Sequence, residues 1–491
     1  MKLVYDVNDK PGWGKTFVFA LQQLLAIMAA TIAVPMTVGN GMSTTAALFG
    51  AGAGTIVYLL FTKSKSPVFL GSSFAFIGSM IAAFGGAWSM QLGYLGLIIG
   101  GVFAGLVYVV IAIIVKFAGV KWIDKIMPAV VIGPTVAIIG LSLAGGAVSD
   151  LMEGGLLKEI NNYVVNTSGA APVIEEVTSS VPVANPYIAL ICGLVTLLVT
   201  VVCSVYGKKM IKMIPFIIGI MAGYATAAIF TAIGMAAGVE GLQIIDFAHF
   251  QGAFSNWLPS FSFVEGFKGL KELSSVNLGT YFGTLAVAYV PVAFVVFAEH
   301  IADHKNLSSI IEKDLLTEPG LHRTLLGDGV GSMVGAFFGG CPNTTYGESV
   351  GCVAISGNAS IRTIWLTAIL AIVVSFISPF AVFLETIPPC VMGGVCIALY
   401  GFIAVSGLKM IQKVDLGDNR NLFVVSVILI AGIGGLVLTF GEITITSVAC
   451  ALILGIIVNL IVNIKKDDSP AAGNADEATA AVSAEQQEEN K

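Results

Sequence analysis

Two acidic residues stand where this chain is otherwise apolar. Glu299 directly follows the run Val295–Ala298, and Glu348 lies in a second apolar segment after Thr345 and Tyr346. An acidic side chain at the centre of a bilayer costs on the order of 2.5–3.5 kcal/mol on insertion scales, and it usually marks a substrate or proton path. The alternative for each is a carboxylate paired for structural reasons. The two acids predict a site that binds a polar solute or moves protons.

Further ionisable groups follow Glu299 closely. Asp303 is four residues later on the same helix face, where it could pass protons to Glu299 or be a solvated helix end. His300 and His304 are either relay groups or capping residues near the cytoplasm. Asp328 is expected near the end of a span, where a bland structural role is favoured.

The elements that must position these residues are membrane spans. The 491 residues are 56% hydrophobic and 11% charged, with a net charge of -6, whereas soluble chains carry about 25% charge. This composition excludes a disordered protein and a cytosolic enzyme, and the missing basic footprint excludes a nucleic-acid binder. Apolar runs of about 20 residues recur about fourteen times between Phe17 and Ile464. We expect an all-α polytopic membrane protein with 14 transmembrane segments.

The lysines and arginines give the orientation. If the N-terminus is cytoplasmic and the spans alternate, all but three of the 24 Lys and Arg fall on the cytoplasmic side, the exceptions being Lys158, Lys268 and Lys271. The positive-inside rule predicts this bias, so both termini are expected inside. The seven cysteines contain no C-x-x-C pair and predict no metal site.

A long loop near the middle of the chain, residues 237–277, leaves seven predicted spans on each side. An odd number per half requires opposite orientations, as in inverted-repeat transporters whose sites lie at broken helices. The third segment of each half is broken by Pro, Gly, Ser or Thr, at Pro67–Phe76 and Cys341–Ser349. We predict a 7+7 inverted repeat with short antiparallel strands in segments 3 and 10. The alternative for each break is a Gly/Pro kink that serves helix packing.

At these residues the sequence resembles the nucleobase–ascorbate transporter family and, within it, the bacterial uracil permeases. The resemblance covers nearly the whole chain up to the last span. The stretches that carry it are Gly71–Phe76, Ala298-Glu-His300, Asp314-Leu-Leu with Pro319–Arg323, Pro342–Glu348, Ile387-Pro-Pro with Val391–Gly394, and Tyr400-Gly401.

The resemblance implies a division into two moving parts. A core domain would comprise residues 1–126 and 278–385, and a gate domain residues 127–277 and 386–464. The two would move against each other for alternating access, in a homodimer within the inner membrane of a bacterial cell. Residues 465–491 are rich in Ala, Asp and Glu and are expected to form a disordered cytoplasmic tail.

The resemblance also implies roles for individual residues. Substrate contacts would come from acids, from backbone amides and from pocket-lining side chains, and proton coupling or gating from a second group. The substrate-binding residues implied are Glu299, Glu348, Phe74, Gly347, Tyr346 and Ala30, and the coupling or gating residues are Asp303, His300, His304 and Tyr400.

The chemistry of uracil fits these residue types. Uracil has two N–H donors and two carbonyl acceptors around a flat ring, so carboxyl groups can accept from it and backbone N–H groups can donate to it. Because uracil is neutral, accumulation against a gradient needs a coupling ion, and a carboxyl group in a low dielectric favours its protonated form. We predict a proton-coupled uracil symporter that is not an enzyme and needs no cofactor besides the proton.

Three departures from the family pattern keep alternatives open. Gln22-Gln23 stands in place of Gln-His, and Ser349 in place of Asn, which leaves xanthine or another purine as a possible substrate. Asp303 stands in place of the proton-linked histidine of uracil permeases, which leaves the proton route and sodium coupling open. A third candidate is an anion transporter on the same fold. It would need a basic residue at the broken helices and usually a soluble C-terminal domain, and the sequence contains neither.

Overall fold

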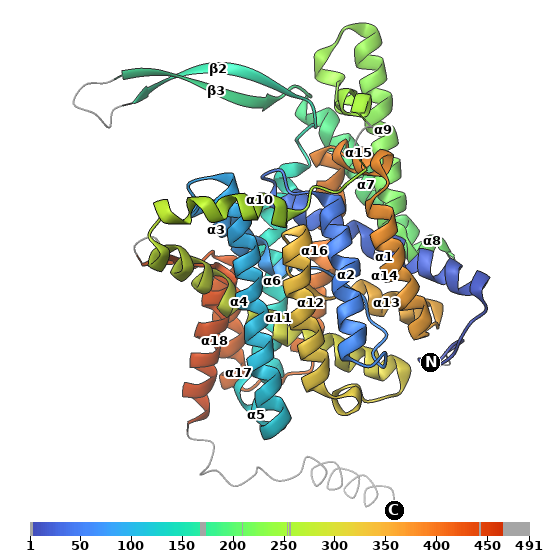
Figure 1. The fold of residues 1–491 in the computed structure, drawn as a ribbon, viewed down its shortest axis with the longest axis vertical. Coiled ribbons are helices and arrows are strands. Elements are labelled where there is room, and N and C mark those ends of the chain that lie inside the picture. Colours follow the sequence, from blue (N-terminus) through green and yellow to red (C-terminus); the bar gives the residue numbers. More distant parts are fainter. Residues whose placement is uncertain are drawn as a thin grey trace, which may run out of the picture.

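The chain is a bundle of long helices that run roughly parallel to one another (Figure 1). The computed structural model describes residues 3–166, 173–208, 210–252, 254, 257–440 and 443–464, so the predicted tail at 465–491 lies outside the described residues. Within those ranges, eight helices are long and apolar enough to cross a membrane: α1 (Trp13–Val38), α2 (Thr44–Phe61), α4 (Met90–Ala118), α6 (Ala129–Asp150), α7 (Pro186–Tyr206), α9 (Pro215–Ala237), α11 (Leu278–Ile311) and α16 (Pro389–Ile411). The protein is therefore a multi-pass membrane protein.

Several further helices are shorter or bent. The helices α14 (Ile361–Ser375) and α15 (Ser378–Glu385) meet at an angle of 81° and make a ninth span if they are counted together. Shorter apolar helices are η1 with α3 (Phe74–Gly85), α17 (Asn419–Ile433) and α18 (Ser447–Asn463). The remaining helical elements are α5 (Lys121–Ile126), α8 (Met210–Met213), η2 (Glu240–Leu242), η3 (Phe247–Gly252), α10 (Ser262–Gly269), η4 (Leu270–Ser275), η5 (Leu316–Gly320), α12 (Leu321–Gly339) and α13 (Gly347–Ser356).

Polar residues at the starts of some of the long helices satisfy one of their first N–H groups. Ser43 accepts from the N–H of Ala46 at the start of α2, and Ser89 does the same for Leu92 in α4, each at 3.1 Å. Asn277 caps α11 in the same way. Such caps supply acceptors that the helix itself lacks, so the apolar sequences between them can cross lipid as uninterrupted helices.

Two strands of three residues interrupt this helical architecture. Strand β1 (Leu70–Ser72) pairs antiparallel with β4 (Asn343–Thr345), with Leu70 opposite Thr345 and Ser72 opposite Asn343. The N–H of Leu70 donates to Thr55 Oγ1 at 2.9 Å, and the Ser332 hydroxyl donates to the carbonyl of Asn343. Pairing and side-chain bonds together satisfy backbone groups that lipid could not satisfy.

Each of these strands continues into a helix. After β1 the chain enters η1 (Phe74–Phe76) and α3 (Ile77–Gly85), and after β4 it enters α13. The ends of the strand pair are closed by two more backbone bonds, from Ser73 N–H to Pro342 O at 2.9 Å and from Tyr346 N–H to Phe69 O at 3.3 Å. Two helix starts therefore lie at opposite ends of one short antiparallel ribbon.

Two other strand pairs are antiparallel hairpins. Strands β2 (Leu157–Asn166) and β3 (Val173–Pro182) form a long antiparallel hairpin that projects away from the helices (Figure 1). Strands β5 (Leu438–Phe440) and β6 (Ile443–Ile445) form a short one between α17 and α18.

The helices pack in two groups with close backbone contacts. Helix α12 packs against α2 and α4, and α16 packs against α6 and α7. A Cβ added to Gly339 would lie 2.5 Å from the Cα of Ala47 in α2, and one added to Gly140 of α6 would lie 2.1 Å from the carbonyl of Tyr400 in α16. Small residues at such positions let membrane helices approach closely.

The residues before α1 form a strap across one end of the bundle. This N-terminal strap, Leu3–Lys10, runs along the turn between α13 and α14. The N–H groups of Ala359 and Ile361 donate to the carbonyls of Tyr5 and Val7 at 2.9 and 3.0 Å. Asp6 is also paired with Lys313, which follows α11, at 2.5 Å.

Candidate functional site

The two acids that stand out in the sequence lie deep in the bundle and keep part of their surface free. Glu299 is in α11 and Glu348 is in the first turn of α13, and both are half-buried, whereas the adjacent Ala298 and Ser349 are fully buried. Within the described part of the chain, no other side chain hydrogen-bonds to either carboxylate. The helices that carry them, α11 and α13, contact each other. The carboxylate oxygens are therefore available to a ligand or a proton.

The strand pair and α11 are tied together beside Glu299. The hydroxyl of Thr345 in β4 donates to Asp303 Oδ2 at 2.7 Å. Because Asp303 is bonded to Thr345 and α11 continues to Ile311, its interpretation as a solvated helix end is wrong. Because Glu299 lies one turn earlier on the same face of α11, it also faces the broken segments.

Gly347 borders open space between α13 and α11. The residue is exposed, and a Cβ placed on it would meet one neighbouring atom within 4 Å, Asp303 Oδ1 at 3.9 Å. The first helical bond of α13 runs from Val350 N–H to Tyr346 O. The N–H of Gly347 therefore precedes the intrahelical pattern, at the positive end of the helix dipole.

Phe74 occupies the corresponding position after β1. It begins η1 and is buried. Its ring lies edge-on to the ring of Tyr400, with centroids 5.6 Å apart. The Tyr400 hydroxyl lies 3.1 Å from Thr37 Oγ1 in α1. Tyr400 thus connects α16 to both α1 and the start of η1.

Tyr346 braces the strand pair. The side chain is buried, and its hydroxyl donates to the carbonyl of Ser72 at 2.8 Å. A Cβ on Gly71 would lie 2.3 Å from the Tyr346 ring, so only glycine allows this approach. Ala30 is fully buried in α1, which packs against β1, α3 and α13.

The two histidines of α11 belong to a buried network rather than to a helix end. His300 Nδ1 lies 2.6 Å from Asp328 Oδ2, and His300 Nε2 lies 3.0 Å from Thr324 Oγ1, both in α12. His304 Nδ1 donates to the His300 carbonyl at 2.8 Å, and its Nε2 lies 2.7 Å from the Tyr58 hydroxyl. The capping interpretation is wrong, because both imidazoles are buried and α11 continues to Ile311.

Asp328 is the residue that the sequence reasoning missed. It was expected near a span end, but it is fully buried within α12 and paired with His300. The available signal was its position between Gly327 and Gly329. Glycines on both sides of an acidic residue allow a neighbouring helix to approach closely. In the structure, Tyr108 of α4 lies against Gly329.

Two of the three departures from the family pattern touch each other. Gln23 Nε2 donates to Ser349 Oγ at 2.6 Å, although the residues are 326 positions apart. The same hydroxyl oxygen accepts from the N–H of Phe69 at 3.0 Å. The two changes together form one satisfied polar contact beside Glu348.

The fold recurs in solved membrane transporters. The transmembrane domain of BicA, a cyanobacterium bicarbonate transporter, matches with a TM-score of 0.56 and 14% identity over 92% of this chain and 97% of that one. The murine anion transporter Slc26a9 in the inward-facing state matches with a TM-score of 0.57 and 13% identity over 94% of this chain and 69% of that one. These matches show that the fold of this chain is one already known among multi-pass membrane proteins.

Sequence comparison identifies the family. The model of the Permease family (Xan_ur_permease) matches residues 14–177 and 167–440. The uracil permease of Bacillus caldolyticus is 37% identical over 94% of this chain and 95% of its own length, and that of Escherichia coli K12 is 33% identical over 93% of each. The chain belongs to the nucleobase–ascorbate transporter family, which confirms the resemblance. Its relatives are named permeases, so the protein is a transporter and not an enzyme.

Proposed function

We propose that this transporter imports uracil together with a proton, by alternating access across the inner membrane of a bacterial cell. The names of its relatives support uracil as the substrate. One observation carries the proposal. Two half-buried carboxylates, Glu299 and Glu348, occur together with the starts of two helices in broken spans.

Uracil matches this combination of groups. The carboxylates accept hydrogen bonds from the ring N–H groups, while the backbone N–H groups of Phe74 and Gly347 donate to the carbonyl oxygens. The exposed surface of Gly347 leaves room for a flat ring. Tyr346 and Ala30 complete the wall on the side of the strand pair.

The arrangement of acids also supports proton coupling. A proton bound by one of them removes a repulsion that substrate binding alone would not relieve. Asp303 is held between Thr345 and the space beside Gly347, so we assign it to proton transfer toward Glu299. His300 and His304 lie on the same helix in a buried network with Asp328 and Tyr58, and we assign them to proton coupling as well.

The helix packing supports the proposed domains. Contacts of α12 with α2 and α4 belong to a core of residues 1–126 and 278–385, and contacts of α16 with α6 and α7 belong to a gate of residues 127–277 and 386–464. Tyr400 makes the gate-to-core contact next to Phe74. Six further spans are proposed in addition to the eight long helices: α12, the bent pair α14 and α15, the two broken segments, α17 and α18. The proposed arrangement is therefore 14 spans in a 7+7 inverted repeat, with both termini cytoplasmic and two copies forming a homodimer.

Uptake of radiolabelled uracil in cells that lack their own permease tests the proposal. Glu299→Gln and Glu348→Gln should each abolish uptake, whereas Glu312→Gln, at the exposed end of the same helix as Glu299, should retain it. Full activity of either site variant contradicts the site assignment.

Two further measurements in the same cells separate the alternatives. Uptake that survives an uncoupler but needs sodium contradicts proton coupling. Competition by xanthine in the absence of uracil uptake indicates a purine permease, and uptake of neither base leaves the anion-transporter alternative.

A further inference from the structure

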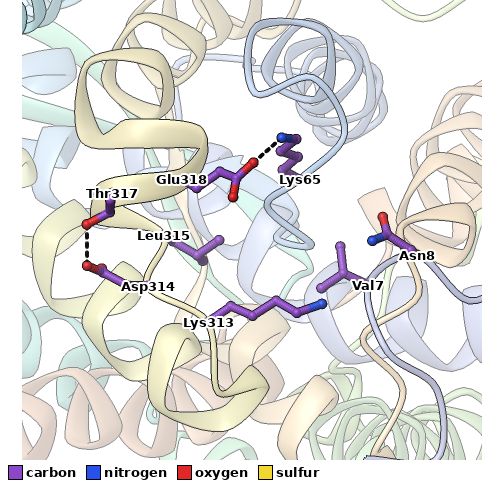
Figure 2. A pocket seen from close by; sticks show the side chains of 8 residues that line it. All are labelled: Val7, Asn8, Lys65, Lys313, Asp314, Leu315, Thr317 and Glu318. Atoms are coloured by element: carbon purple, nitrogen blue, oxygen red, sulfur yellow. Dashed lines mark hydrogen bonds and ion pairs between the residues drawn. The ribbon is translucent and has the colours of Figure 1, made fainter.

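Two cavities flank the N-terminal strap at one end of the bundle. The first, of about 430 Å³, is shown in Figure 2 and is lined by Val7, Asn8, Lys65, Lys313, Asp314, Leu315, Thr317 and Glu318. Its charges are matched within the protein, because Lys65 pairs with Glu318 and Lys313 pairs with Asp6. This cavity has no need of an external ion.

The second cavity adjoins the first and carries unmatched positive charge. It measures about 580 Å³, shares Asn8 and Lys65 with the first, and is also lined by Asp9, Lys10, Lys63, Ser64, Ile361, Arg362 and Trp365. The Asp9 carboxylate accepts from the backbone N–H of Asp6 at 2.7 Å.

Three basic side chains of the second cavity lack an acidic partner. Within the described residues, Lys10 and Lys63 form no ion pair. Among the described residues Arg362 forms no ion pair either, and it lies over the ring of Trp13 at 3.6 Å and donates to the carbonyl of Pro11 at 3.4 Å. The guanidinium is held in place while its charge remains available.

The turn that carries Lys63 is held in an uncommon conformation. Lys63 and Ser64 both have left-handed backbone, with φ of 52° and 54°, which is unfavourable for residues other than glycine. The indole N–H of Trp365 donates to Ser64 Oγ at 3.0 Å, and the N–H of Ser64 donates to Leu59 O at 2.8 Å. Backbone strain of this kind is maintained mainly at ligand sites and switches.

The second cavity lies where the lipid-facing surface of α1 begins. Trp13 is 70% exposed, and the exposed apolar residues Phe17, Val18 and Leu21 follow it on the same helix. Tryptophan is enriched at the level of the lipid headgroups. Lys10 precedes this tryptophan and Arg362 stacks on it, so these two charges lie beside a residue type that is typical of the headgroup level.

We propose that the second cavity binds a phosphate group, supplied by the headgroup of an anionic phospholipid. Arginine binds phosphate through two parallel hydrogen bonds, and lysine binds it as a point charge. The lipid source rests on the cytoplasmic placement of this face, which is part of the proposed function. A soluble phosphate ester has the same recognition chemistry, and the test separates the two sources.

The test is lipid binding to the full chain in mild detergent, measured by native mass spectrometry. The ligands are phosphatidylglycerol, phosphatidylcholine and glycerol 3-phosphate, each titrated separately. The cavity variant is Lys10→Gln/Lys63→Gln. The matched control, Lys116→Gln/Lys413→Gln, removes two exposed lysines that line neither cavity.

We expect the natural protein and the control to bind phosphatidylglycerol alike and the cavity variant to bind it about 30-fold more weakly, since each lysine near a lipid surface contributes roughly fivefold. Equal weakening in both variants indicates general attraction and overturns the proposal, as does equal binding of phosphatidylcholine and phosphatidylglycerol by the natural protein. Glycerol 3-phosphate that binds as tightly as the lipid, with the same dependence on Lys10 and Lys63, overturns the lipid source. Because no outcome depends on uptake, failure here is distinct from failure of the proposed transport function.

Discussion

The contact between Gly71 and Tyr346 allows a quantitative test of how the site is built. An alanine Cβ at position 71 would overlap the Tyr346 ring at 2.3 Å. Overpacking of a well-packed interior costs about 1–3 kcal/mol. Displacing the ring also loses its hydrogen bond to Ser72 O, about 0.5–1.5 kcal/mol, while the lower entropy of alanine in the unfolded chain returns about 0.4–1 kcal/mol. Gly71→Ala should therefore lower the free energy of unfolding by about 2 kcal/mol.

Gly347→Ala is the matched comparison, because it adds the same methyl group at the other broken segment. A Cβ there meets one protein atom, at 3.9 Å, and alanine at the start of a helix is favourable by up to about 1 kcal/mol relative to glycine. Its unfolding free energy should be unchanged or slightly higher. Its methyl group nevertheless occupies the space assigned to uracil, so uptake should fall at least tenfold.

The assay is unfolding of the full chain in mixed micelles, combined with uracil uptake. A second background, Tyr346→Ala, removes the ring, and in that background Gly71→Ala should cost nothing. The difference between backgrounds isolates the steric term because the two residues are in contact. An equal cost in both backgrounds refutes the clash. Loss of stability in Gly347→Ala refutes the open space beside α13.

Three other contacts make further predictions. Asp328→Ala should lower the unfolding free energy by about 3–5 kcal/mol, because it leaves the buried His300 without its partner, and Asp328→Asn should cost less because it keeps an acceptor. Ser349→Ala should cost about 1–3 kcal/mol, because the buried N–H of Phe69 loses its acceptor and Gln23 Nε2 keeps only the Ser349 carbonyl at 3.3 Å. Asp6→Asn should speed hydrogen exchange in the strap up to about fivefold, since exposed ion pairs contribute about 0.2–1 kcal/mol.

The Asp6 prediction has a pH dependence. The hydrogen bond from Lys313 is the main cause that holds the pKa of Asp6 below its ordinary value. The stabilisation by this pair is complete above the ordinary aspartate pKa of about 3.9 and is lost as the pH falls through the lowered value. Exchange of the Ile361 N–H, corrected for its intrinsic rate, should therefore rise in the natural protein only below about pH 4.

Control variants accompany these three predictions. Ser356→Ala removes a half-buried hydroxyl that donates to the Cys352 carbonyl of its own helix and accepts from the N–H of Asn358 at 3.2 Å, and it should cost less than Ser349→Ala. Glu318→Gln breaks the pair with Lys65 without touching the strap, so strap exchange should not change. Unaltered stability in Asp328→Ala would contradict the buried pairing.

The features that were predictable from the sequence depend on the residue composition of short segments. Glu299 and Glu348 stood out because so few charges occur in apolar segments, and the clusters of Pro, Gly, Ser and Thr indicated where helices break. The repeated apolar runs that are long enough to cross lipid indicated a multi-pass protein, and the helices of the structure confirm this.

The features that were not predictable depend on which helix lies next to which. From the sequence of α11 alone, His300 could be interpreted as a capping residue. Its partner Asp328 comes from a different helix, α12. The bond between Gln23 and Ser349 joins the two halves of the chain, and neither residue signals the other. The left-handed backbone at Lys63 was likewise not predictable, because the position holds neither glycine nor asparagine.

The pairing of β1 with β4 also has a consequence for biogenesis. Tyr346 is 274 residues from Ser72, so at about 5–20 residues per second the first strand waits roughly 14–55 s for its partner to be synthesised. During that interval its backbone must be satisfied by residues already made. Thr55 meets this need, because its hydroxyl oxygen accepts from the N–H of Leu70 and its hydroxyl lies 3.2 Å from the carbonyl of Leu70. The first half of the chain thus carries a partner for Leu70 that remains in the folded protein, and the strand pair beside the proposed substrate site forms only when the second half arrives.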